Sequence, residues 1–68
     1  MSLPNGTIKA VNNATVSLNN ANVSAVRAEN AFVQAPTQAN LNKLNKAINT
    51  LQRAKKIAEA ANANMLRN

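Results

Sequence analysis

Hydrophobic residues recur every seven positions in the first half of the chain. Residues 11–17 (VNNATVS) and 18–24 (LNNANVS) are nearly identical, and the same register continues to Ala35. One core position of this heptad holds Val11, Leu18, Ala25 and Phe32, and the other holds only Ala14, Ala21, Ala28 and Ala35. Alanine at one core position predicts helices that pack at very close range. Because a chain of 68 residues supplies few partners itself, we expect copies of the chain to pack together.

A second apolar strip accompanies the heptad. This strip lies on a different side of the predicted helix from Val11 and Leu18, and it consists of Val16, Val23, Val26 and Val33. One interpretation is a single broad face on a monomeric hairpin. With only one other helix in the chain, however, the valines would remain in water, so we favour self-assembly. We expect both strips to form the subunit packing, together with Leu44, Ile48 and Leu51.

Proline and threonine positions predict the boundaries of two helices. Pro36 removes a backbone donor and disfavours helical geometry in the preceding residue. Thr7 and Thr37 are suitable N-caps. The sequence therefore predicts an all-α hairpin with a flexible start over residues 1–7, a helix over 8–35, a loop at 36–37 and a helix over 38–66. Because valine and asparagine weaken the first helix, an extended or partly disordered N-terminal region is the alternative.

The second predicted helix has two distinct faces. At steps of three and four residues, one face carries Leu44, Ala47, Ile48, Leu51, Ala54, Ala58, Ala61 and Met65. The opposite face carries Asn42, Lys46, Asn49, Arg53, Lys56 and Arg67. An ordinary solvated face has this composition. The functional alternative is a surface that meets a channel interior, a phosphate backbone or an acidic partner.

Composition argues against an enzyme. The chain has no cysteine, no histidine and only Glu29 and Glu59 as acids, so we expect no catalytic residues, no metal site and no cofactor. We also expect no small-molecule substrate and no membrane span, because no segment approaches about 20 consecutive apolar residues. Residues 1–10 lack the features of a general secretory signal.

The formal charge of +6 suggests nucleic-acid binding as an alternative. One phenylalanine and no tyrosine or tryptophan provide little surface for base stacking. Arg27, Arg53 and Arg67 are the residues that could make planar bidentate contacts. Because of its net charge, a small basic helical module that binds nucleic acid is a second hypothesis.

The helix break and the apolar spacing after it resemble those of a known family. Ala35-Pro36-Thr37-Gln38-Ala39-Asn40-Leu41, followed by Leu44, Ala47, Leu51 and Ala54, resembles the needle and Hrp-pilus subunits of type III secretion systems. The likeness covers residues 28–61. It implies a secreted helical hairpin that polymerises into a hollow filament, with its second helix lining the channel and its first helix towards the outside.

This resemblance implies specific partners and a location. The partners would be further copies of the chain, translocating effector proteins and the base of the secretion apparatus, at the cell surface and in the extracellular space. The acid-free start, rich in serine, threonine and asparagine, is similar to an uncleaved type III export signal. Asn42, Lys46, Asn49, Arg53, Lys56 and Arg67 would line the lumen. A virion or scaffold component of a phage shares this assembly physics and is a further alternative.

Overall fold

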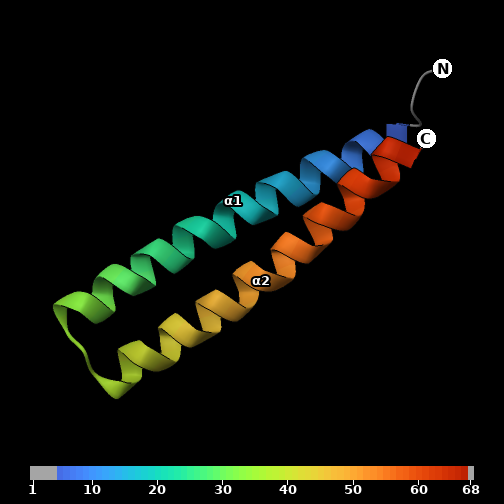
Figure 1. Ribbon diagram of the computed structural model, residues 1–68. Coiled ribbons are helices and arrows are strands. Elements are labelled where there is room, and N and C mark those ends of the chain that lie inside the picture. Colours follow the sequence, from blue (N-terminus) through green and yellow to red (C-terminus); the bar gives the residue numbers. More distant parts are fainter. Residues whose placement is uncertain (1–4, 68) are drawn as a thin grey trace.

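The chain forms a long antiparallel pair of helices (Figure 1). The computed structural model describes residues 5–67, with helix α1 at Asn5–Gln34 and helix α2 at Gln38–Arg67. The hairpin is 53 Å long and only 13 by 12 Å across. The ends of α1 and α2 that lie away from the loop meet at one tip of the hairpin (Figure 1). The predicted all-α two-helix hairpin is confirmed.

The start of α1 differs from the sequence prediction. The helix begins at Asn5 rather than Ile8, so Thr7 lies inside the helix and is not its N-cap. The predicted flexible start was wrong for residues 5–7, and residues 1–4 lie outside the described part of the chain. Thr7 is half-buried one heptad before Ala14, so it continues the side of α1 that packs on α2. Tertiary packing of this kind overrides weak helix propensity.

The loop joins the helices over residues 35–37. The amide of Thr37 donates to the carbonyl of Ala35 at 2.8 Å, a three-residue turn centred on Pro36. α1 ends at Gln34, one residue earlier than predicted, although the Ala35 amide still bonds the Ala31 carbonyl at 2.9 Å. Thr37 caps α2 as predicted, because its Oγ1 accepts the Asn40 amide at 3.2 Å.

The alanine-rich heptad of α1 packs against α2 of the same chain. Within the described residues, the buried hydrophobic side chains are Ala14, Ala21, Ala25 and Ala58, each exposed by 9% or less. Half-buried residues continue the contact on both helices: Thr7, Val11, Leu18, Ala28 and Phe32 on α1, and Asn40, Leu41, Leu44, Ala47, Leu51, Ala54, Ala61 and Met65 on α2. The sequence left open which apolar strip packs within the chain, and the structure gives this role to the heptad, which α2 covers. Ile48, exposed by 39%, flanks the contact, and Ala35 is exposed in the loop.

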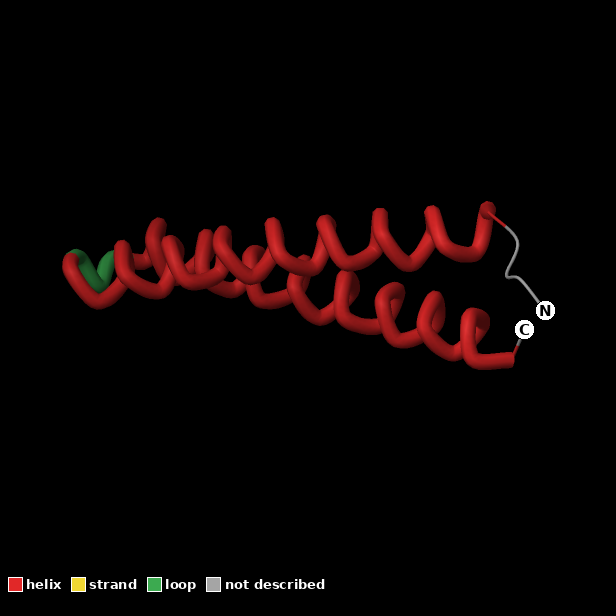
Figure 2. Tube along the Cα trace, turned by 90° about the horizontal axis from the view of Figure 1, so that it is seen from above, coloured by secondary structure: helices red, strands yellow, loops and turns green. Residues whose placement is uncertain are grey.

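Small and large residues alternate across this contact. Counting outward from the loop along both helices places Leu18 level with Ala54, and Ala21 level with Leu51. The narrow cross-section requires the two helices to pack closely side by side. The helices overlap near the free tip in Figure 1 and near the loop in Figure 2, so they wind around each other, as a heptad repeat requires.

The contact between the helices is thin. No large side chain among the described residues is fully buried. A hairpin of this size has little apolar surface with which to offset the conformational entropy of two long helices. We therefore expect a lone subunit to be only marginally stable.

Candidate assembly surfaces

The first candidate surface is an apolar ridge on α1, formed by Val16, Val23, Val26 and Val33. These side chains lie on the side of the helix away from α2, and they are exposed by 58%, 48%, 49% and 72% respectively. The prediction that the second helix of the same chain would leave these valines in water is confirmed. Four β-branched residues along one helix face form a continuous apolar strip, unlike the single hydrophobic residues that are scattered over most protein surfaces.

The second candidate surface is a cationic edge on α2, formed by Asn42, Lys46, Asn49, Arg53 and Lys56. All five residues are exposed, and Lys46 and Arg53 also reach the flank of the hairpin where α2 lies beside Ser17 of α1. Asn49, Arg53 and Lys56, with Gln52, line a shallow depression of about 340 Å³. Arg67 is the last residue of α2, and its side chain lies outside the described residues.

Charge is divided unequally between the helices. α1 carries Lys9 and Arg27 against Glu29. α2 carries six basic residues against Glu59: Lys43, Lys46, Arg53, Lys55, Lys56 and Arg67. The basic character of the chain is therefore a property of α2. The valine ridge thus lies on the weakly charged helix and the cationic edge on the strongly basic one.

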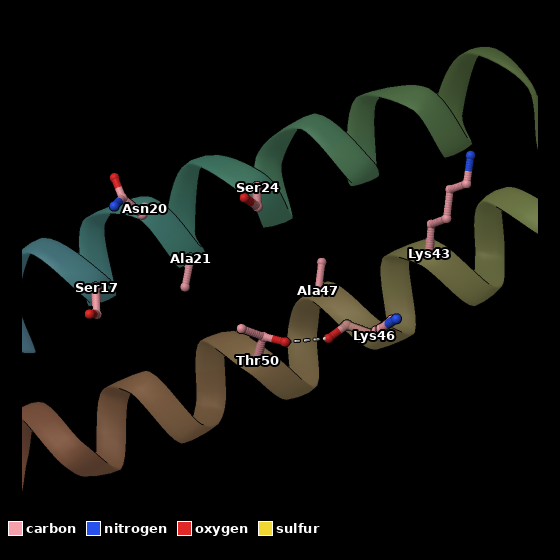
Figure 3. A pocket seen from close by; sticks show the side chains of 8 residues that line it. All are labelled: Ser17, Asn20, Ala21, Ser24, Lys43, Lys46, Ala47 and Thr50. Carbon is pink, nitrogen blue, oxygen red and sulfur yellow. Dashed lines mark hydrogen bonds between the residues drawn. The ribbon is translucent and has the colours of Figure 1, made fainter.

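The third candidate surface is a groove along one flank of the hairpin (Figure 3). Its volume is about 510 Å³, and its lining is formed by Ser17, Asn20, Ala21, Ser24, Lys43, Lys46, Ala47 and Thr50. Ser17 and Thr50 also line an adjoining depression of about 270 Å³, which reaches Ile57. The walls are low because the α1 residues that flank the contact are small.

Side chains mark the two ends of this groove. Lys43 extends from α2 towards α1 at the loop end (Figure 3). Ile57, exposed by 62%, lines the far end. Thr50 Oγ1 donates to the Lys46 carbonyl at 3.0 Å, which holds the threonine methyl group and hydroxyl against its own helix. Arg53 lines this far end together with Ile57, so cations border the groove at both ends and the exposed Ile57 marks only one of them.

Two features of these surfaces were missed by reasoning from the sequence. The groove was overlooked, although Ser17 and Ser24, seven residues apart beside the core alanines, were its signal. The double role of Asn40 was also overlooked. Its Nδ2 donates to the carbonyls of Ala31 and Ala35, at 3.3 and 2.8 Å, while its backbone amide bonds Thr37.

The described residues contain no cluster of three or more histidine, cysteine or carboxylate side chains that could hold a metal ion. Neither α1 nor α2 has a stretch long and apolar enough to cross a membrane. The surfaces described for the hairpin are an apolar ridge, a cationic edge and a groove.

Comparison of the chain with protein-family models, with curated proteins and with solved structures found no match.

Proposed function

We propose that this protein is a structural subunit that polymerises into a hollow extracellular needle or pilus of a type III secretion system. The observation that carries the proposal is the exposed valine ridge on α1. The hairpin already uses its heptad to pack α1 on α2, so α2 is not available to cover Val16, Val23, Val26 and Val33. Burial of such a strip by further copies of the chain is a favourable solution.

The position of the cationic edge supports a conduit. Lys46, Arg53 and Lys56 are exposed on α2, with amide side chains between them. Lining a channel, this surface would stay hydrated, so that unfolded effector proteins could slide along it without apolar adhesion. The partners proposed are therefore neighbouring copies, effectors in transit and the base of the secretion apparatus.

The thin core supports export of the subunit before assembly. The buried hydrophobic residues described above are all alanines, and α1 is rich in residues with weak helix propensity. A subunit of this kind unfolds at low cost, and it gains order when neighbours cover its apolar ridge. Location at the cell surface and beyond follows from this proposal.

Electron microscopy of the purified chain tests the proposal. Concentrated protein in physiological salt is expected to form unbranched filaments with a central channel, and analytical ultracentrifugation is expected to show a critical concentration for assembly. Monodisperse particles at millimolar concentration, across a range of pH and salt, would refute the proposal.

The exposed cationic edge supports nucleic-acid binding as a second candidate function. Three cations on one side of α2 could follow a phosphate backbone. Titration of labelled duplex and single-stranded DNA and RNA at low and physiological salt separates the two candidates. Affinity that falls steeply with salt, in a chain that forms no filaments, would favour this candidate, and absence of binding at low salt would eliminate it.

A further inference from the structure

The valine ridge and the groove match in length. At 1.5 Å per residue, the ridge from Val16 to Val33 runs for about 25 Å along α1. The groove from Lys43 to Ile57 runs for about 21 Å along α2. A ridge of this length fills the groove and extends slightly beyond it.

The side chains of ridge and groove also match in size and spacing. Val16 and Val23 are seven residues apart, and so are the groove residues Ser17 and Ser24. Valine has few rotamers, so a row of valines forms a stiff ridge. Serine and alanine leave space for such a ridge between α1 and α2, in the manner of close helix packing.

Ridge and groove lie on different faces of the hairpin. The ridge faces away from α2, whereas the groove is lined by both helices. One copy can therefore insert its ridge into a second copy while its own groove receives a third. A contact between two different surfaces continues from copy to copy and builds a ring or a filament, unlike a two-fold contact, which stops at a dimer.

Charge fixes the direction of this contact. Glu29, the one acidic residue of α1, lies between Val26 and Val33 at helical spacings of three and four residues. Lys43, at the loop end of the groove, is level with Glu29 when residues are counted outward from the loop. A level neighbour that points the same way thus brings Glu29 to Lys43 and Lys46, whereas a reversed neighbour brings Glu29 to Ile57 and to one cation, Arg53.

We infer that neighbouring copies of this chain pack in parallel, with the valine ridge of one copy seated in the groove of the next and its Glu29 beside Lys43 of that neighbour. This inference rests on the proposed function, because it specifies the contact that builds the polymer. Lys46 and Arg53 of the cationic edge border the groove, and the other residues of this edge lie outside the contact.

Charge reversal tests the inference. Glu29→Lys and Lys43→Glu are each expected to raise the critical concentration for assembly tenfold or more, and the double variant is expected to restore it to within about threefold of the starting protein. Glu59→Lys is the matched control, because it makes the same charge change on an exposed residue away from ridge and groove. Circular dichroism of each variant verifies that the helical content is kept.

Disulfide cross-linking between introduced cysteines tests the contact directly, since the chain has no cysteine of its own. Filaments grown from equal amounts of Val23→Cys and Thr50→Cys chains are expected to give a disulfide-linked dimer on oxidation. Filaments from a mixture of Val23→Cys and Glu59→Cys chains are the control, and they are expected to remain unlinked between those two chains.

The outcomes separate the inference from the proposed function. Filaments of the starting protein with no rescue by the double variant, or with no link between positions 23 and 50, would overturn the inference and leave the proposed function standing. A starting protein that forms no filaments would overturn both.

Discussion

Asn40, in the first turn of α2, donates its side-chain amide to the carbonyl of Ala35 at 2.8 Å, just beyond the end of α1. A second, longer contact joins the same amide to the Ala31 carbonyl. The last carbonyls of a helix have no partners within the helix. One residue of α2 thus satisfies the end of α1, and it ties the two helices together across Pro36.

Replacing Asn40 with alanine is expected to destabilise the hairpin. The Asn40→Ala variant loses two side-chain hydrogen bonds to carbonyls at the helix end, which corresponds to about 1 to 2 kcal/mol of unfolding free energy. Urea denaturation followed by circular dichroism measures the loss. Asn45→Ala, at an exposed position in the next turn, is the control. Equal midpoints for the two variants would show that the loop does not depend on Asn40.

Overfilling the contact between the helices is expected to reduce both folding and assembly. Ala21 is exposed by only 7%, lies level with Leu51 and also lines the groove, so the added atoms of Ala21→Leu crowd the helix contact and intrude on the groove. A cost of about 1 to 3 kcal/mol is expected, with the same direction at Ala28. Thermal denaturation and filament pelleting measure the two effects. Ala60→Leu, at an exposed position of α2, should change neither.

Polar substitution on the valine ridge is expected to weaken assembly and to leave the subunit helical. Val16 and Val23 are about half exposed in the single hairpin, so Val16→Ser and Val23→Ser lose little packing within the chain. Each is expected to raise the critical concentration about tenfold, corresponding to about 1.4 kcal/mol per contact. Sedimentation of a concentration series provides the measurement. If a variant with both substitutions assembled as well as the starting protein, the ridge would not be part of the subunit contact.

Removing the central cation of α2 is expected to change transport and to preserve assembly. Arg53 is exposed on the cationic edge, so Arg53→Ala should leave filament yield within about twofold of the starting protein and alter effector secretion. Filaments of Arg53→Cys test the proposed channel lining. They should react with a small maleimide and resist a large polymer-linked maleimide. Fast reaction with both reagents would place this edge on the outside of the filament.

Reasoning from sequence identified the hairpin because its strongest signals are local. Pro36 marks the break, Thr37 caps α2, and the apolar spacing of α2 predicts the face that packs on α1. The start of α1 was misplaced by three residues, because Thr7 has the chemistry of an N-cap and its burial against α2 depends on tertiary structure.

The heptad shows where sequence patterns stop being informative. A repeat of Val11, Ala14, Leu18 and Ala21 specifies a close helical partner, and it does not say whether that partner is the same chain or another. The structure assigns this surface to α2 and leaves the valines exposed. The groove beside Ser17 and Ser24 was missed because the small side chains only hint at it, and its depth depends on how both helices pack at that flank.

Asn5 and Arg67, the outer ends of the two helices, lie together at one tip, and Pro36 lies at the opposite tip of a body 53 Å long. Any tag or fluorophore fused to either terminus will therefore mark the same pole of the subunit. In a row of parallel copies such labels would form a regular ladder, and a second label placed in the loop would read out filament polarity in a light or electron microscope.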